Sequence, residues 1–330
     1  MLRGLLSRSP IDGFVLAILA AVVVAAIFPA RGAGAHIVDV LVVVAIVALF
    51  FLYGARLHPR DALAGVTHWR LHVTILAFTF IVFPCIGAAL RPITEPLIGH
   101  DLYTGLLYLT LVPSTVQSSI AFTSIARGNI AGAIVSASAS NLLGVLLTPV
   151  LVVLLMPGTS GVHITASSVV AIVLEILVPF IAGQLCRPVI SPLLKRYAEP
   201  TKLVDRGSII LVVYSAFSEG VRNGIWSLVR PWQVVAVAVI ALLLVIVMLV
   251  VTRAAGRRLG FNRGDVIAIQ FCGTKKSLAT GLPMATVLFS GPVVGLIVLP
   301  LMIFHQLQLI LCSWLASRYA QDTDAAPTAT

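Results

Sequence analysis

Two adjacent lysines, Lys275 and Lys276, lie inside a stretch that otherwise has the composition of a membrane-spanning helix. A charged side chain at bilayer depth is costly, so it normally faces a partner, a cavity or a permeation path. Gly273 precedes the pair, and Gly281 and Pro283 follow it, so the helix is weakened where the polar residues gather. Interrupted helices with polar groups at mid-membrane are typical of secondary transporters. We therefore expect the chemistry of this chain to lie around the lysine pair.

A second polar patch interrupts another apolar segment just after Pro113. Its members are Ser114, Thr115, Gln117, Ser118 and Ser119. Isolated hydroxyls in a membrane helix commonly bond only to the preceding turn. Unwound backbone in lipid, however, must find hydrogen-bond partners, which side chains, an ion or a solute can supply. We interpret this patch, together with Thr274, both lysines and Ser277, as the lining of a solute or ion pathway.

The composition restricts the class of protein. Of the 330 residues, 59% are hydrophobic and 10% are charged, and the mean hydropathy is +1.07, which indicates a polytopic protein of the lipid bilayer. The net charge of +10 does not indicate a nucleic-acid partner, because the basic residues fall between the apolar runs. The chain has no HExxH motif, no paired membrane aspartates and no cysteine spacing suited to zinc. We expect that the protein is not an enzyme and that it has no cofactor. The sequence identifies no definite metal site.

Hydropathy and helix breakers predict ten membrane spans. They lie at about 12–30, 37–55, 70–90, 103–125, 130–156, 164–185, 207–225, 232–252, 265–288 and 292–316. With the N-terminus inside, sixteen of the 22 Lys and Arg residues fall in cytoplasmic segments, four fall outside, and two are the intramembrane pair. This bias predicts an integral protein of the bacterial cytoplasmic (inner) membrane with both termini in the cytoplasm.

The spans predict an internal repeat. We assign residues 1–186 to a first part with five to six spans, with repeat one at 12–156, and we assign repeat two to 164–316. A basic, proline-containing cytoplasmic linker occupies 187–206, and 317–330 is expected to be a disordered cytoplasmic tail. A repeat of five spans must insert its second copy upside down. The segment Ser119–Thr123 in span four is similar to Ser277–Gly281 in span nine.

The four strings that carry a family resemblance are Phe51–Arg56, Pro113–Asn129, Leu203–Ser208 and Phe271–Ala279. They resemble the bile acid/sodium symporter superfamily, in an outlying branch of bacterial sodium-dependent transporters related to a eukaryotic orphan carrier linked to calcium handling. The resemblance covers roughly residues 10–316. It implies ten helices in two inverted five-helix repeats, with helices four and nine broken and crossed. It also implies a two-helix panel that moves against a core domain, with a ligand cavity between them.

The resemblance also implies sodium ligands, and several of these positions differ here. Phe271 stands where the family has a glutamate, Lys275 stands where it has a glutamine, and Thr79 stands at the glutamine of span three. The later hydroxyl positions of the family correspond to alanines, but the neighbouring Ser136, Ser138, Ser140 and Asn141 lie near enough to compensate. They could support a residual sodium site near Ser119, Ser136 and Asn141. An ammonium at about 4 Å repels sodium by ~4 kcal/mol at an effective dielectric of about 20. We therefore expect the Lys275 ammonium to replace one sodium site.

Two other ionisable side chains complete the candidate pathway. Glu175 lies in span six and could pair with a lysine or carry a proton, and His305 lies in span ten beside two glutamines. The sequence does not decide whether Na⁺ or H⁺ is the coupling ion. The leading hypothesis is a carrier for a small organic, anionic or amphipathic solute. The alternatives are a regulatory membrane protein that moves no solute and an intramembrane lipid-processing enzyme, and the oligomeric state stays open.

Overall fold

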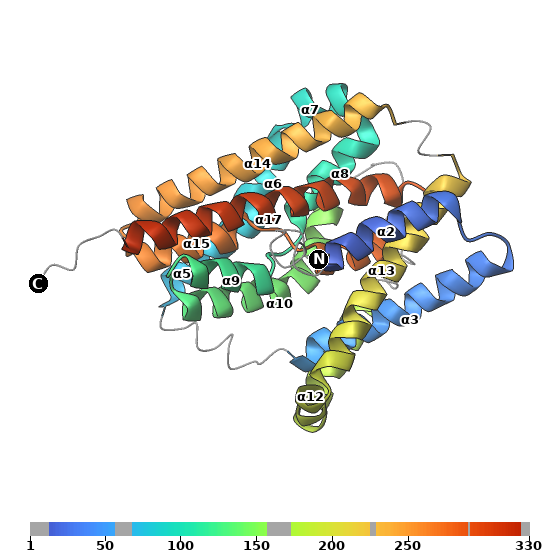
Figure 1. Ribbon diagram of the computed structural model, residues 1–330, viewed down its shortest axis with the longest axis horizontal. Helices are drawn as coiled ribbons and strands as arrows, with labels where there is room; N and C mark the ends of the chain where they lie inside the picture. The colour runs from blue at the N-terminus through green and yellow to red at the C-terminus, as the bar shows by residue number, and fades with distance from the viewer. Residues whose placement is uncertain (1–12, 57–67, 157–172, 225–228, 290, 325–330) are drawn as a thin grey trace, which may run out of the picture. The chain divides into compact units, whose positions relative to one another are not determined.

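Every regular element that the structure describes is a helix (Figure 1). The computed structural model describes residues 13–56, 68–156, 173–224, 229–289 and 291–324. Six of its helices are long and apolar enough to cross a membrane, namely Ala33–Arg56, Trp69–Ala89, Ile130–Leu155, Leu174–Leu194, Pro231–Arg258 and Val294–Gln321. The all-helical class is therefore confirmed for the described residues, and six helices are candidate membrane spans by length and composition. The part of span six between 164 and 172 lies outside the described residues.

The elements follow one another in this order along the chain: α2 (Gly13–Ile27), α3 (Ala33–Arg56), α5 (Trp69–Ala77), the π-helix η2 (Phe78–Val82), α6 (Phe83–Ala89), α7 (Arg91–Ile98), α8 (His100–Leu111), α9 (Gln117–Ile125), α10 (Ile130–Leu155), the π-helix η3 (Val173–Leu177), α12 (Val178–Arg196), α13 (Ala198–Arg222), α14 (Pro231–Arg258), α15 (Arg263–Thr274), α16 (Leu278–Leu288) and α17 (Val294–Asp324).

The chain forms two compact units. The first unit takes its residues from 1–57, 149–231 and 282–299, and its main helices are α2, α3, α12 and α13. Helix α3 packs against α12 and α13, and α13 also packs against α2.

The backbones of α3 and α12 lie very close to each other. A Cβ atom added at Gly54 would lie 2.0 Å from the carbonyl oxygen of Phe180, and one added at Gly183 would lie 2.0 Å from the carbonyl oxygen of Phe51. Small residues at such contacts allow membrane helices to approach each other closely. The two glycines are therefore required by the packing of the first unit.

The second unit contains both lysines and every predicted pathway residue except Glu175. It takes its residues from 58–148, 232–281 and 300–330. Helices α8 and α15 form its interior, since every residue from Leu102 to Leu111 and from Asp265 to Thr274 is buried. A helix that is apolar and buried on all sides needs neighbours around its whole circumference. Helices α5 and α9 supply part of that cover, because both pack against α15.

Both segments that the sequence marks as interrupted are interrupted in the structure. Helix α8 ends at Leu111, the backbone is extended at Val112, and α9 begins at Gln117. Helix α15 ends at Thr274, the backbone is extended at Lys275, and α16 begins at Leu278. Each of the two predicted spans is thus a pair of half-helices joined by a few residues of irregular backbone.

Three local expectations need correction. The predicted linker 187–206 is helical, because α12 runs to Arg196 and α13 starts at Ala198. The predicted disordered tail 317–330 is helical as far as Asp324, because Tyr319 is buried and its hydroxyl donates to Gln270. Residues 325–330 lie outside the described part of the chain.

The third correction concerns the turn after α9. The sequence Arg127-Gly128-Asn129 predicts a turn in which Gly128 and Asn129 supply the left-handed backbone. The structure instead has the positive φ, 55°, at Arg127. Gly128 is required for another reason, because a Cβ there would lie 2.6 Å from the Ile267 side chain.

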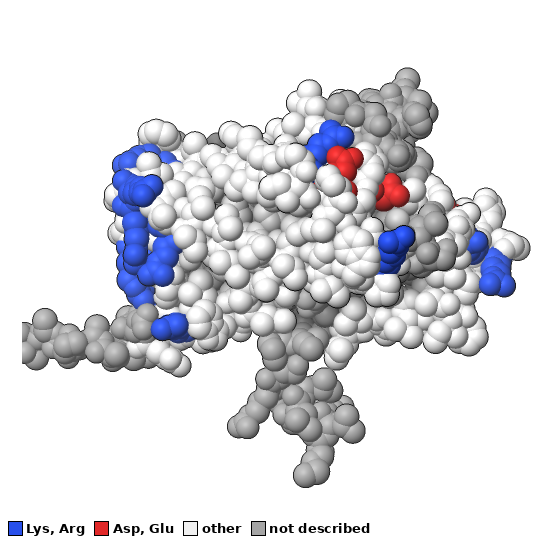
Figure 2. All heavy atoms as spheres, turned by 90° about the horizontal axis from the view of Figure 1, so that it is seen from above, with Lys and Arg blue, Asp and Glu red and all other residues white. Residues whose placement is uncertain are grey.

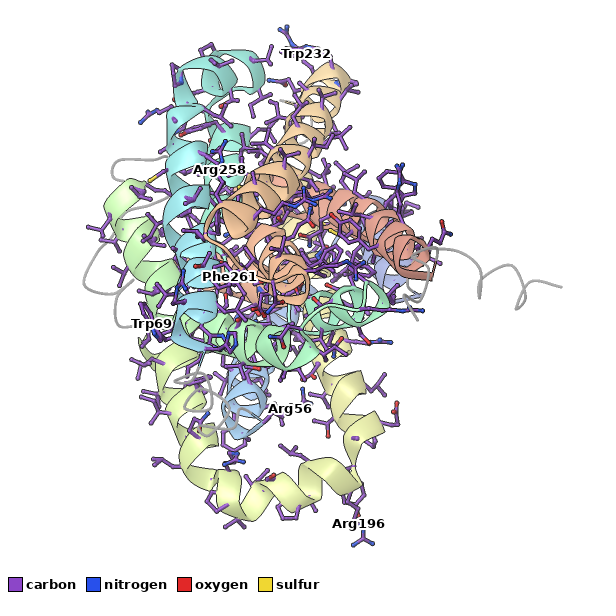
Figure 3. The ribbon with its side chains drawn as sticks, turned by 90° about the vertical axis from the view of Figure 1, so that its left-hand side faces the viewer. Arg56, Trp69, Arg196, Trp232, Arg258 and Phe261 are labelled. Carbon is purple, nitrogen blue, oxygen red and sulfur yellow. The ribbon has the colours of Figure 1, made fainter. Side chains whose placement is uncertain are left out.

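Arginines gather at one end of the second unit, where Figure 2 shows a band of basic side chains. They include Arg70 at the start of α5, Arg258 at the end of α14 and Arg263 at the start of α15. The Arg70 guanidinium lies 5.5 Å from the centre of the Phe261 ring and donates to the Leu259 carbonyl (3.1 Å). Figure 3 looks onto this end and shows Arg258 and Trp232 at opposite ends of α14.

The glycine contacts of the first unit lead to a testable prediction. We expect Gly183→Ala to lower the melting temperature of the purified protein by several degrees, because overpacking typically costs about 1–3 kcal/mol. Gly207→Ala is the matched control, since nothing lies within 4 Å of a Cβ at that helical position. The control should melt at the wild-type temperature or slightly above it. Equal melting of the two variants would contradict the close contact.

Candidate functional site

The two helix interruptions are joined directly to each other. The Ser277 backbone N–H donates to the carbonyl oxygen of Pro113 over 2.8 Å. The Ser114 hydroxyl donates to the carbonyl oxygen of Cys272 over 2.7 Å. These bonds connect the end of α8 with the end of α15, so the irregular backbone of each break is a partner of the other. We call residues 112–116 and 275–277, with the side chains that bond to them, the crossing.

Side chains of α10 pair three of the backbone groups freed in the first break. A proline has no N–H and its neighbours here are not helical, so the last carbonyls of α8 have no helical donor. The Leu111 carbonyl accepts from the Thr148 hydroxyl (3.0 Å). The Ser114 N–H donates to the Ser140 hydroxyl (3.0 Å), and the Ser114 carbonyl accepts from the Asn141 amide (2.7 Å).

A glutamine of α17 holds the second break. The Gln308 side-chain oxygen accepts from the Lys276 N–H, and its amide nitrogen donates to the Lys276 carbonyl, each over 2.8 Å. Ser277 caps α16, because its hydroxyl accepts from the Thr280 N–H (3.2 Å). The Thr280 hydroxyl then donates to Asn141 (2.8 Å), which connects the second break to α10.

The Lys276 ammonium lies within the crossing. Its Nζ atom donates to the backbone carbonyls of Thr79 (2.8 Å), Thr110 (2.7 Å) and Val112 (2.9 Å). It also lies 4.5 Å from the centre of the Phe83 ring. The side chain is fully buried. A lysine has three N–H donors only when it is protonated, so this bonding pattern is that of an ammonium ion.

Lys275 is equally buried but has a different environment. Its Nζ atom lies 3.6 Å from the centre of the Phe122 ring. Within the described residues this nitrogen has no hydrogen-bond partner. A ring face attracts a cation by electrostatics but leaves the N–H donors of the amine unused. The two adjacent lysines therefore differ, since one is saturated with acceptors and the other has donors available.

The structure brings some of the predicted pathway residues together. Thr79, Ser114, Asn141, Lys276 and Ser277 all bond within the crossing. Two further residues lie beside it. The Thr274 hydroxyl is 3.3 Å from the Thr252 hydroxyl, and His305 Nδ1 is 2.9 Å from the Gln308 amide.

Other predicted residues have local partners. Thr115 bonds to Ser118 (2.9 Å) and Ser119 (3.1 Å), and the Thr123 hydroxyl donates to the Ser119 carbonyl one turn back (2.7 Å). Gln117 is exposed. The polar run at the start of α9 thus bonds mainly within itself, as isolated hydroxyls in membrane helices commonly do.

Three predicted residues lie away from these bonds. The Ser136 hydroxyl pairs with His72 Nδ1 (2.7 Å), and Ser138 is half-buried on the same helix. Glu175 is half-buried in the π-helix η3 and belongs to the first unit.

Sequence reasoning missed three residues of the crossing, which are Thr148, Thr280 and Gln308. A usable signal existed for Gln308, because an amide in a long apolar helix needs a partner. No comparable signal existed for the two threonines. Their role depends on which face of each helix meets the breaks.

The positions that the family resemblance assigns to sodium do not fit that ion here. Phe271 packs between the rings of Phe122 and Tyr319, at centroid distances of 6.1 and 6.4 Å, and offers no oxygen ligand. Ser136 pairs with a histidine, and the Asn141 side-chain oxygen accepts from Thr280. Among the described residues, no group of three or more His, Cys, Asp or Glu side chains could hold a metal ion.

Comparison with known proteins places the chain in a family. Residues 12–321 match the SBF-like CPA transporter family (DUF4137). The chain belongs to this family. "Uncharacterized protein PA2026" of Pseudomonas aeruginosa is 48% identical over 319 residues, which is 96% of both chains. "Putative symporter YfeH" of Escherichia coli (strain K12) is 45% identical over 314 residues, 95% of this chain and 94% of that one.

A vertebrate protein is also similar to this chain. "Sodium/bile acid cotransporter 7" of Danio rerio is 29% identical over 316 residues, 94% of each chain. Membership of the SBF-like family confirms the resemblance to the bile acid/sodium symporter superfamily and identifies the chain as an integral membrane protein of transporter type. Two of these three relatives are named as transporters, which is consistent with a protein that is not an enzyme.

The glutamine contact leads to a second prediction. Gln308→Leu leaves the Lys276 N–H and carbonyl unpaired and buried, and each such group costs about 1–3 kcal/mol. We expect a clearly lower melting temperature in detergent. Gln306→Leu, on the same helix, is the control, since no hydrogen bond joins Gln306 to either break within the described residues. An equal loss in both variants would show that the amide contact does not stabilise the crossing.

Proposed function

We propose that this protein is a secondary active transporter that moves a small organic solute, anionic or amphipathic, by alternating access. The observation that carries the proposal is the crossing, in which two interrupted helices meet around a buried ammonium. Irregular backbone at membrane depth is tolerated only where protein buries it or where it lines a cavity, and interrupted helices commonly form the transport sites of secondary carriers. Relatives that are named as a symporter and a cotransporter support the same class.

We assign the architecture of the proposed carrier as ten spans in two inverted five-helix repeats. Under this proposal, α8 with α9 is the fourth span and α15 with α16 is the ninth. The second unit is the core, and the first unit is the panel. The band of arginines at one end of the second unit supports a cytoplasmic position for that end, in the bacterial inner membrane, with both termini in the cytoplasm.

Lys275 is the residue that we assign to the solute. Its N–H donors have no acceptor among the described residues, and its side chain is fully buried beside Phe122. A carboxylate or another anionic group would supply the missing acceptor through a charge-assisted hydrogen bond. The aromatic ring beside the lysine is compatible with the apolar part of an amphipathic solute.

The residues favour a coupling mode other than sodium symport. An aromatic cluster occupies the position of one implied sodium ligand, and a lysine occupies another. We therefore propose proton coupling, exchange or facilitated movement for this chain. A regulatory membrane protein that moves no solute is the competing function, and an intramembrane lipid-processing enzyme is a weaker one; a flux measurement separates both from a carrier.

Loss of the Lys275 amine is the direct test of the proposed solute site. After a transported solute has been found with proteoliposomes, we expect Lys275→Ala to reduce its uptake at least about tenfold, because a charge-assisted hydrogen bond contributes about 1.5–3 kcal/mol. Gln306→Leu should keep wild-type uptake. Melting curves of both variants must show folded protein. Undiminished flux through folded Lys275→Ala would refute the assignment.

A stability screen tests coupling and solute class together. We expect the melting temperature of the wild-type protein to be the same in sodium and in choline chloride at equal ionic strength, because Phe271 and Lys275 supply no side-chain oxygen at two of the implied sodium-ligand positions. Small organic anions that bind should raise it, since a ligand of the folded state stabilises by mass action. A saturable increase with sodium alone would overturn the coupling proposal and leave the transporter proposal standing.

A further inference from the structure

The environment of the Lys276 ammonium has the form of an ion site. Three backbone carbonyl oxygens lie 2.7–2.9 Å from Nζ, and the Phe83 ring faces it at 4.5 Å. The three carbonyls come from two different segments, since Thr79 is in η2 whereas Thr110 and Val112 flank the end of α8. The site is therefore built by the tertiary structure and not by one turn of chain.

Each carbonyl is free because its helical donor is missing. Thr79 lies in a π-helix, whose bonds run from residue i to i+5, and five residues after it stands Pro84, which has no N–H. Thr110 would be the partner of the Ser114 N–H, which instead donates to Ser140. Val112 has extended backbone (ψ 155°) and accepts no helical bond. These oxygens would need a donor or a cation whatever residue stood at 276.

The chemistry of the ligands selects a monovalent cation. All three are neutral carbonyls, and no described ion pair involves Lys276. The negative end of the α8 dipole adds to their attraction. Calcium and magnesium prefer carboxylates and distances of about 2.3–2.6 and 2.0–2.1 Å. Carbonyl groups arranged around a point are the ligands by which proteins replace the hydration shell of a monovalent ion.

We propose that Thr79, Thr110 and Val112, with the ring of Phe83, form a monovalent-cation site that the protein fills with its own Lys276 ammonium. The site takes an ion with the size and hydrogen-bonding of ammonium. Because the cation is covalently attached, the three carbonyls keep their hydrogen-bond donors without a dissolved ion. A chain without the Lys276 side chain would need a free cation or another hydrogen-bond donor at this point.

The neighbouring lysine provides the natural contrast. Lys275 is the same residue type, is equally buried and belongs to the same break. Its nitrogen contacts a ring and has no oxygen acceptor among the described residues. A cation added after loss of Lys275 therefore has no set of carbonyls to bind.

Chemical rescue tests the proposal. Lys276→Ala removes three carbons and one nitrogen, which is the heavy-atom composition of propylammonium. In tetramethylammonium chloride, which has no N–H, we expect this variant to melt at least about 5 °C below the wild type. Ammonium or propylammonium chloride at equal ionic strength should restore half or more of that loss. Neither salt should act specifically on the wild type or on Lys275→Ala.

Two results would overturn the proposal. One is a melting temperature of Lys276→Ala that is the same in all of these salts. The other is equal recovery with propanol, which would show that only the apolar cavity is refilled. The readout is thermal stability and requires no transported solute, so the proposal can fail while the transporter assignment stands, or the reverse.

A second pair of variants covers the case in which Lys276→Ala does not fold. Lys276→Met and Lys275→Met keep most of the side-chain volume and remove the amine. Lys276→Met should melt at least about 5 °C below Lys275→Met, because it leaves three buried carbonyls unpaired. Its melting temperature should not respond to ammonium, since the methionine occupies the space of the ion. A Lys276→Met protein as stable as Lys275→Met would refute the site.

Discussion

The pairing of backbone groups freed by two helix interruptions is the constraint on which the core of this protein depends. In a membrane no water replaces a lost helical hydrogen bond, so each exposed carbonyl or N–H must find a partner in the protein. The first break is paired by Ser140, Asn141 and Thr148 of α10, and the second by Gln308 of α17. These helices are therefore fixed around the breaks by polar contacts as well as by apolar packing.

The lysine pair shows how position decides the role of a side chain. Lys276 donates to three carbonyls, and its charge completes the polar structure of the crossing. Lys275 starts one residue earlier on extended backbone and is directed instead to the Phe122 ring. Successive side chains on extended backbone point to opposite sides. One break can therefore supply a structural cation on one side and an available donor on the other.

Two positions at which the resemblance implies sodium ligands carry side chains without oxygen here, namely Phe271 and Lys275. Phe271 belongs to an aromatic cluster with Phe122 and Tyr319, and the same cluster leads to Gln270 through the Tyr319 hydroxyl. The cluster thus links α9, α15 and α17 with apolar and polar contacts of their own. These contacts stabilise the interior where the resemblance implied a metal ion.

Composition and local sequence were sufficient for the class of protein, the apolar segments and the location of both interruptions. Hydropathy is a local property, and Pro113 and Gly273 weaken a helix in any context. The same local reasoning did not foresee the helices within 187–206, where prolines are tolerated in exposed helix. It also failed for 317–324, which is helical because Tyr319 is buried and bonds to Gln270, and for the Arg127 turn. It did not foresee that Lys276 donates to three backbone carbonyls.

The sequence by itself determined that two polar breaks and two buried charges had to be accommodated within apolar helices. Only the tertiary structure decided which groups accommodate them. Whether a lysine meets three carbonyls or an aromatic ring depends on the relative placement of η2, α8 and α15, and Gln308 lies far along the chain from the break that it holds. Such partners are set by helix packing, because the hydrogen bond of a freed backbone group is specified by proximity in space and not by spacing in sequence.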